Sequence, residues 1–307
     1  MGTPELASHV LQAIVNNGFQ IVAAVTAPDR PAGRGRKIRQ SPVKELADGL
    51  NIPVLQPENL KSPEFISRLK SLKPDIQVVV AFRMLPESVW AIPPKGTFNL
   101  HASLLPDYRG AAPINWTIIN GEKESGVTTF LLDHQIDTGK ILFQKKIPLQ
   151  TYETAGSLHE KVKTAGAELV VHTINALNAG TVKPMHQEEL VSGHDQLHKA
   201  PKIHKEDCRI NWDKSSREVV NHIHGLSPVP GAFCEVKVKQ DVSALIKIYH
   251  ARPMEVTHDH EPGKLLTDNK SYIRFTTGDG MVEILELQLP GKKRMSTKEL
   301  LRGMQFE

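Results

Sequence analysis

The stretch from Asp75 to His101, DIQVVVAFRMLPESVWAIPPKGTFNLH, decides the fold of this chain. It opens with a continuous apolar run, IQVVVAF, and closes with a second short segment, GTFNLH. An unbroken apolar run of this length is typical of a strand that is buried on both faces, as in a parallel sheet covered by helices. The stretch therefore predicts two buried strands, near residues 75–82 and 96–101.

Helical and strand patterns alternate on both sides of these two strands. Upstream we expect helices at 4–17, 42–50 and 63–72, with strands at 21–26 and 54–55. Downstream we expect helices at 113–120 and 155–179, with strands at 127–132 and 141–147. Such alternation predicts a doubly wound, Rossmann-type α/β sheet.

The pattern changes after residue 182. Residues 183–204 are polar and rich in His and Lys, which favours a linker. Residues 205–307 contain one helix near 216–224 and then five or six short alternating segments separated by turn residues, a pattern typical of a small OB-like β-barrel. We therefore predict a catalytic domain at 1–182, a linker at 183–204 and a barrel domain at 205–307.

The chain also begins unusually for a doubly wound fold. Such a sheet normally opens with a strand that leads into its first loop, whereas the first residues here, Met1-Gly2-Thr3-Pro4, already have the composition of that loop. We expect that the central first strand is missing, and that its neighbours are left without a partner for their backbone groups.

Composition excludes several classes of protein. With 38 Lys and Arg against 34 Asp and Glu, the net charge is only +4, which argues against a DNA-packaging protein. Two cysteines are too few for a disulfide framework, and indicate a reducing compartment such as the cytosol. No apolar run approaches the roughly 20 residues of a membrane span, and the first residues do not have the pattern of a secretory signal.

The residues best suited to chemistry follow directly from the second strand. Asn99 and His101 are two apart, so strand alternation places both side chains on one face, at the end where open α/β sheets carry their sites. An amide donor beside an imidazole suits attack on a carbonyl, which needs an oxyanion donor and a proton acceptor. Taken alone, an Asn-x-His pair is more often a buried structural pair whose side chains are hydrogen-bonded to the backbone than a catalytic one. Asp137 would supply a carboxylate to orient the imidazole and stabilise its charge, although taken alone Asp-x-Gly is more often turn chemistry.

Positive charge is concentrated between Pro28 and Lys44. This segment has six basic residues against one acidic residue, Asp29, so the rest of the chain is close to neutral. Its prolines and glycines predict a bent loop whose basic side chains suit phosphate contacts, although a solvated basic loop is an equal alternative from charge alone. A smaller basic cluster, Lys292 to Lys298, follows a turn near the C-terminus.

Several other site types are disfavoured. The glycines at 33 and 35 lack the third glycine of a dinucleotide-binding fingerprint, which argues against a nicotinamide dehydrogenase. The histidines at 222, 224, 258 and 260 have no further ligands at zinc spacing. We therefore expect no metal.

The ordered set of motifs GTPE, PDRPAGRGRK, SPVK, VVVAF, FNLHASLLPDYRGAAPI and IDTG resembles the methionyl-tRNA formyltransferases over nearly the whole chain. The resemblance implies that 10-formyltetrahydrofolate donates a formyl group to the methionine of initiator tRNA. It implies a catalytic triad of Asn99, His101 and Asp137. It also implies the following contacts: Ser103, Leu104, Leu105 and Pro106 with the folate, and Arg30, Gly33, Arg34, Arg36, Lys37, Lys292 and Lys293 with the tRNA.

The resemblance also implies a monomeric bacterial enzyme of the cytosol without a membrane association. Two alternatives stay open at this point. In the first, the protein is a formyltransferase with a different acceptor, either a nucleotide-sugar amine or glycinamide ribonucleotide. The protein would be an inactive RNA-binding relative if the missing first strand prevents the catalytic domain from folding.

Overall fold

The computed structural model describes residues 1–32, 37–191, 196–239 and 242–306. The chain forms two compact units that are not contiguous in sequence. The first contains Met1–Gly110, Gly126–Ile147 and Lys161–Lys199; the second contains Ala111–Ser125, Pro148–Glu160 and Ala200–Glu307. The two domains expected from sequence, 1–182 and 205–307, are instead continuous stretches of the chain. Their boundaries remain a prediction.

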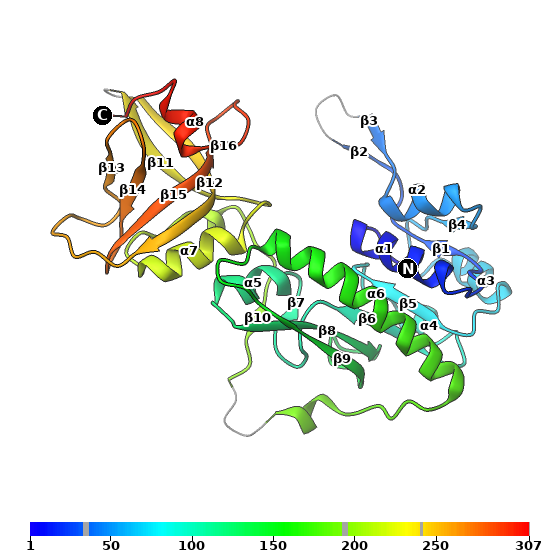
Figure 1. Cartoon of the computed structure of the whole chain (residues 1–307). Helices are drawn as coiled ribbons and strands as arrows, with labels where there is room; N and C mark the ends of the chain where they lie inside the picture. The colour runs from blue at the N-terminus through cyan, green and yellow to red at the C-terminus, as the bar shows by residue number, and fades with distance from the viewer. Residues whose placement is uncertain (33–36, 192–195, 240–241, 307) are drawn as a thin grey trace. The chain divides into compact units, whose positions relative to one another are not determined.

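The first unit is built on a four-stranded sheet (Figure 1). Its strands are β5 (Gln77–Val80), β6 (Thr97–His101), β8 (Glu124–Leu131) and β9 (Ile141–Pro148), in the order β5-β6-β8-β9. The two strands of the opening stretch, β5 and β6, pair in parallel, whereas β8 runs antiparallel to β6. The α/β fold class expected from the sequence is confirmed, with an antiparallel strand in the sheet.

The other elements of this unit are short. They are α1 (Glu5–Asn16), β1 (Ala24–Val25), β2 (Arg30–Ala32), β3 (Lys37–Arg39), α2 (Pro42–Gly49), β4 (Val54–Leu55), α3 (Pro63–Ser71), α4 (Glu87–Trp90), β7 (Arg109–Gly110) and the 3-10 helix η1 (Gln187–Leu190). Helices α2 and α3 begin where serine side chains, Ser41 and Ser62, accept a backbone hydrogen bond, each followed by a proline at the first helical position.

The first two residues lie between β1 and β5. The Gly2 amide donates to Val25, the Val80 amide donates to Met1, and burial lowers the pKa of the Met1 amino group to about 5. A cavity of about 320 Å³ continues from them between residues 21–25 and 75–80. The strand expected at 21–26 is correspondingly shorter, because only Ala24 and Val25 have a ladder partner, in β4.

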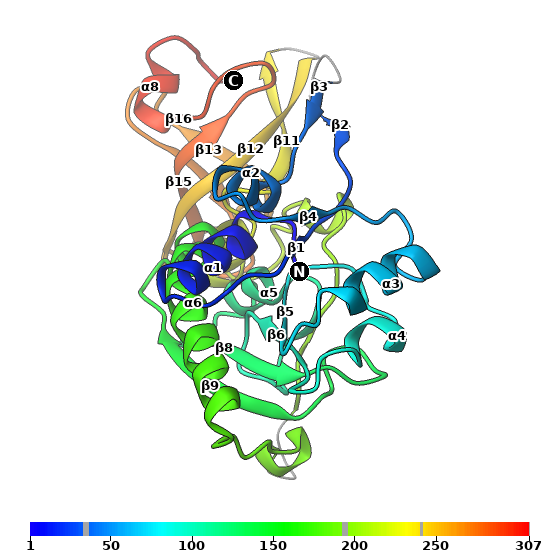
Figure 2. The same ribbon diagram turned by 90° about the vertical axis from the view of Figure 1, so that its right-hand side faces the viewer.

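Helix α6 (Ala155–Ala179) begins in the second unit and continues into the first. Within the first unit it packs on the sheet, where Thr173 is hydrogen-bonded to Thr129 of β8 at 2.9 Å between hydroxyl oxygens. A methyl group on Gly166 would lie 2.7 Å from the Leu100 side chain, so glycine permits this close approach. Helix α1 lies alongside α6 (Figure 2), and Lys163 forms an ion pair with Glu5.

The second unit contains a six-stranded antiparallel sheet, curled into a half-barrel that we call the barrel. Its elements are α5 (Pro113–Ile119), β10 (Lys199–Ala200, at the boundary), the 3-10 helix η2 (Glu206–Cys208), α7 (Ser216–Gly225), β11 (Ala232–Lys239), β12 (Val242–Met254), β13 (Leu265–Thr267), β14 (Ile273–Thr276), β15 (Met281–Gln288), β16 (Met295–Ser296) and α8 (Thr297–Leu301). The strand order is β11-β12-β15-β14-β13, with β16 on β15. The expected C-terminal β-barrel architecture is confirmed.

The core of this unit is apolar. Ile223 of α7, Ile248 of β12 and Ile284 of β15 are among its fully buried side chains. Helix α7 starts with a capping box between Ser215 and Glu218, which satisfies backbone donors that a helix end otherwise leaves unpaired. Among the described residues, no helix has the length and apolar character needed to cross a membrane.

Candidate active site

Strand β6 places the first two candidate residues. Asn99 and His101 are near its carboxyl end, opposite Phe130 and Thr128 of β8, with their side chains on the same face. The His101 side chain is buried, and the Asn99 side-chain oxygen is buried without a hydrogen-bond partner in the described part of the chain. A buried amide oxygen of this kind is costly unless a further group completes it, so the arrangement favours a ligand site.

The imidazole of His101 is held by a backbone carbonyl. Its Nε2 lies 2.9 Å from the carbonyl oxygen of Tyr108. Because a carbonyl oxygen only accepts, Nε2 must donate, and the neutral ring carries its lone pair on Nδ1. The tautomer is therefore set by Tyr108, a role that sequence reasoning had given to the carboxylate.

Asp137 faces the other ring nitrogen. Its Oδ2 lies 3.8 Å from His101 Nδ1, which is too long for a hydrogen bond but close enough for charge to act. The same oxygen accepts a hydrogen bond from the Gly110 amide at 3.1 Å. Asp137 has a left-handed backbone with φ 57°, which an aspartate adopts more readily than most residues. The fold thus brings the carboxylate beside the imidazole, although 36 positions separate them in the chain.

The segment Ser103–Pro106 forms the loop after β6. The Ser103 and Leu105 side chains are buried inside the unit, and Leu104 contacts Gly126. Thr128 fixes the loop because its hydroxyl accepts from the Leu105 amide and donates to the Ser103 carbonyl. These side chains thus have a packing role in the fold, and their expected contact with folate stays a prediction.

The basic segment expected as a loop is partly a β-hairpin. Strands β2 and β3 pair antiparallel, with Arg30 directly opposite Arg39. The one acidic residue, Asp29, pairs with Lys44 at 2.5 Å, and this contact lowers the pKa of the Asp29 carboxyl. Gly33, Arg34 and Arg36 lie outside the described residues, as does the side chain of Lys37.

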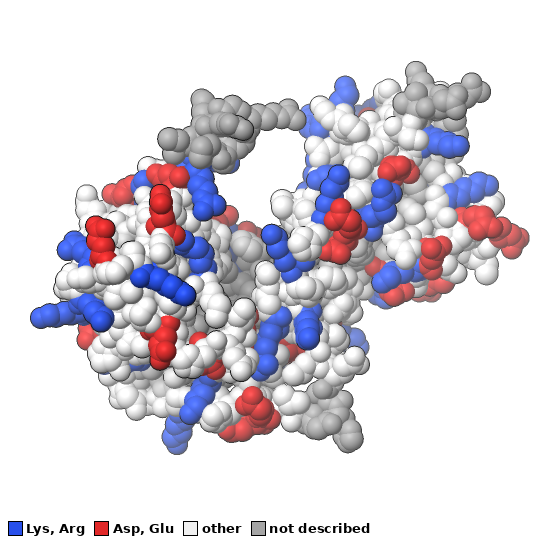
Figure 3. All heavy atoms as spheres, turned by 180° about the vertical axis from the view of Figure 1, so that it is seen from behind, with Lys and Arg blue, Asp and Glu red and all other residues white. Residues whose placement is uncertain are grey.

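In the barrel unit, Lys292 and Lys293 lie exposed in the turn between β15 and β16. The neighbouring Arg294 is different, because it pairs with Glu286 and lies over the Tyr249 ring. Figure 3 shows basic and acidic side chains interspersed on the face that it presents. The proposed tRNA contacts of Lys292 and Lys293 therefore rest on their exposure and on the family resemblance.

Three groups that contact the predicted triad residues His101 and Asp137 were missed from sequence. The Tyr108 carbonyl and the Gly110 amide are backbone groups, so the residue types at these positions do not indicate their role. Gln187 is a buried amide whose Nε2 donates to the Asp137 and Gly139 carbonyls, each at 2.9 Å. The one available signal was the glycine in Tyr-Arg-Gly after Asp107, because glycine often marks an unusual backbone conformation. Gly110 indeed has a positive φ of 131°.

Comparison with known proteins gives two family matches. Residues 1–174 match the formyl transferase model, and residues 202–305 match the model of the formyl transferase C-terminal domain. The methionyl-tRNA formyltransferase of Bacteroides fragilis is 49% identical over 304 residues, covering 99% of this chain and 93% of that protein. The methionyl-tRNA formyltransferase of Flavobacterium johnsoniae is 48% identical over 306 residues, covering 100% of this chain and 95% of that protein.

Solved structures show a related fold at lower identity. An N-formyltransferase from Helicobacter canadensis, in complex with folinic acid and dTDP-3-aminofucose, gives a TM-score of 0.64 at 22% identity, covering 92% of this chain and 96% of that one. The sugar 3N-formyl transferase WlaRD gives 0.62 at 20% identity, covering 95% and 97%.

Proposed function

This chain belongs to the formyl transferase family, and we propose that it transfers a formyl group to the methionine amino group of initiator methionyl-tRNA. The observation that carries the proposal is the near-complete coverage, in both domains, of relatives named methionyl-tRNA formyltransferases. Family membership and the folates in related structures support a folate co-substrate. We take 10-formyltetrahydrofolate as the donor, as the resemblance to methionyl-tRNA formyltransferases implies.

The reaction begins with attack of the methionine nitrogen on the formyl carbon. Only the neutral amine has a lone pair, and an α-amino pKa near 8 leaves about a tenth of it neutral at pH 7. Close positioning of amine and formyl carbon therefore contributes more than basicity. The Asn99 amide is suited to donate a hydrogen bond to the oxyanion as the carbon becomes tetrahedral.

His101 takes up the proton that the attacking amine loses. With Nε2 donating to the Tyr108 carbonyl, Nδ1 is the available base, and it becomes N–H as the ring becomes cationic. The carboxylate of Asp137, 3.8 Å away, stabilises that cation by charge. The bond between the formyl carbon and the folate nitrogen then breaks, and the proton passes to that nitrogen.

The basic hairpin supplies contacts for the acceptor. Arg30 and Arg39 are cross-strand neighbours of like charge, an arrangement that destabilises a hairpin in the absence of an anion. Phosphates of an RNA backbone would relieve this repulsion and make the binding depend on salt. Together with Lys292 and Lys293, and with Gly33, Arg34, Arg36 and Lys37, these residues form the proposed tRNA-binding set.

The decisive experiment compares acceptors. Purified protein is given formyl-labelled 10-formyltetrahydrofolate with either methionyl-initiator tRNA or a dTDP-amino sugar. We expect label on the tRNA alone. Label on the sugar nucleotide would assign the chain to the sugar-modifying branch, and an absence of label on both would contradict an active transferase.

We further propose that the protein acts as a monomer in the bacterial cytosol. The relatives from Bacteroides fragilis and Flavobacterium johnsoniae are bacterial, and both cysteines, Cys208 and Cys234, are free and buried. Burial raises the pKa of the Cys234 thiol to about 12, which makes it unreactive. Light scattering of the full chain measures the oligomeric state.

A further inference from the structure

The segment expected to be a simple linker is bound to the active-site loops of the first unit. We define the strap as residues 185–191 and 196–199, which are described residues of this segment within that unit. At its start, Met185 exchanges two backbone hydrogen bonds with Ile141 of β9, at 2.8 and 2.9 Å. This isolated antiparallel bridge holds the start of the strap to the sheet.

Gln187 forms the side-chain hydrogen bonds between the strap and the loops around Asp137 and Arg109. Its side chain is 1% exposed, and its two amide hydrogens go to the Asp137 and Gly139 carbonyls. Its Oε1 accepts from Nε and Nη2 of Arg109, at 3.0 and 2.6 Å. Both donors and both lone pairs of the amide are thus used, which is the full capacity of a glutamine side chain.

These contacts join two loops that carry the triad's supports. Asp137 lies in one loop, and Arg109 begins the short strand β7 after the other, between the carbonyl of Tyr108 and the amide of Gly110. That carbonyl sets the His101 tautomer, and that amide binds the Asp137 carboxylate. Gln187 therefore fixes the distance between the two groups that act on opposite sides of the imidazole.

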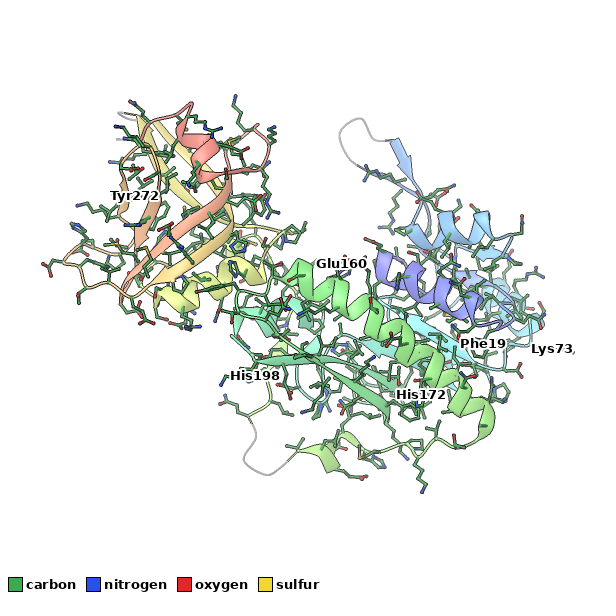
Figure 4. The ribbon with its side chains drawn as sticks, in the orientation of Figure 1. Phe19, Lys73, Glu160, His172, His198 and Tyr272 are labelled. Atoms are coloured by element: carbon green, nitrogen blue, oxygen red, sulfur yellow. The ribbon has the colours of Figure 1, made fainter. Side chains whose placement is uncertain are left out.

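The far end of the strap holds the same loop from a second direction. The carbonyl of His198, labelled in Figure 4, accepts from the Tyr108 amide at 2.9 Å. The His198 amide donates to Asp107 at 2.6 Å, and its ring stacks on Tyr108 with centroids 5.2 Å apart. Tyr108 has a left-handed backbone with φ 58°, which is unfavourable for an aromatic residue and needs such support.

We propose that Gln187 is a positioning residue for the transfer reaction, acting through Asp137 and through the Tyr108 carbonyl on His101. This proposal rests on the proposed function for its kinetic effect. A glutamine is required because glutamate lacks the two donors and would oppose two carbonyl oxygens, whereas shorter or apolar side chains leave those carbonyls and Arg109 unpaired in a buried place.

The test is a double-mutant cycle with Asp137. Gln187→Met, which keeps the size of the side chain, should lower kcat about 10- to 100-fold while KM for the folate changes less than twofold. In the Asp137→Asn background the same change should lower kcat by less than about twofold, since the residue it positions is already altered. Gln187→Ala is measured in parallel, and Glu188→Gln, an exposed neighbour on η1, is the matched control that should leave kcat unchanged.

A second readout needs no turnover. Nitrogen NMR of His101 should report the Nε2–H tautomer in the unaltered protein and a mixture of tautomers in Gln187→Met. Equal effects of Gln187→Met on kcat in both backgrounds would overturn the proposal, as would an unchanged tautomer or loss of folding in both Gln187 variants. If the unaltered chain transfers no formyl group, the proposed function fails, and the NMR result still decides the role of Gln187.

Discussion

Around β6, buried polar groups are joined by hydrogen bonds between residues far apart in sequence, whereas the barrel core consists of apolar side chains on strands that mostly pair with near neighbours in the chain. Gly110 and Asp137 are 27 positions apart, and Arg109 and Gln187 are 78 apart. In the barrel, β11 pairs with β12, the next strand in the chain, and Ile246 and Ile248 are fully buried.

This difference indicates where each region is vulnerable. Apolar burial contributes about 25 cal/mol per Å² and has no direction, so the barrel tolerates small shifts. The hydrogen bonds around His101 depend on direction and on distances of about 3 Å, so we expect small shifts there to affect the proposed chemistry before stability. We therefore expect a substitution at His101 to lower the rate of transfer, one in the barrel to alter stability, and one in the basic hairpin to weaken tRNA binding.

The largest expected effect is on the reaction itself. His101→Ala removes the proposed base and its cationic form, and should lower the single-turnover rate of formyl transfer about 10²- to 10⁴-fold. The thermal midpoint should change little, because the side chain contributes a polar contact rather than core volume. His9→Ala, on the exposed side of α1, is the control. Near-normal transfer by His101→Ala would remove histidine from the mechanism.

The second prediction concerns acid stability of the barrel unit. Burial, followed by the nearby His250, lowers the pKa of His224 to about 4, and burial also lowers the pKa of His222 to about 4. The unfolded chain takes up these protons near pH 6.5, whereas the folded chain does not until about pH 4. Stability is therefore fully present above pH 6.5 and decreases as the pH falls towards 4, by about 3 kcal/mol for His224.

Denaturant unfolding at pH 7.5 and 4.5 measures this effect, with fluorescence of Trp212, which stacks on Phe275 in the barrel, as the signal. His224→Gln keeps an acceptor for the Ala251 amide but does not titrate in this range, so it should reduce the difference between the two pH values. The exposed His204→Gln should leave it unchanged. An equal pH dependence in all three proteins would show that His224 does not contribute.

The smallest expected effect lies in the basic hairpin. Arg30→Ala should weaken one phosphate contact by about 1 kcal/mol, the Coulomb energy of a solvated pair at contact, or roughly fivefold in KM for tRNA. The salt dependence of tRNA binding should lose about one counterion, while KM for the folate stays unchanged. Arg68→Ala, an exposed arginine on α3, is the control. A raised KM for the folate would contradict a role in tRNA contact.

The sequence allowed the main elements to be predicted because their signals are local. The apolar run at 76–82 became β5, the helices expected at 42–50 and 63–72 became α2 and α3, and turn residues divided the barrel strands. The pairing of Asn99 with His101 on one face followed from strand alternation. The partners of a single strand, by contrast, depend on the rest of the fold, so the antiparallel direction of β8 was not foreseen.

Long-range polar contacts were the part that could not be predicted. Asp137 was a candidate partner of His101 from its residue type, but a turn aspartate was the more frequent alternative, and only the family resemblance favoured the pairing. Gln187 lies in a polar segment that has the composition of a linker, and its burial results from contacts with residues up to 78 positions away. The hairpin of β2 and β3 was expected as a loop, because its prolines and glycines mask the pairing of Arg30 with Arg39.

The strap also determines how this protein can be recombined with its relatives. Sequence alone suggests an exchange of barrels at residue 183, but a crossover there would bring in a foreign Gln187 and His198 together with the new barrel. A junction after Lys199 would leave these residues with the loops they bind. The same reasoning applies to insertions. Extra residues within η1 would displace Gln187 from Asp137, whereas a flexible linker would tolerate such an insertion.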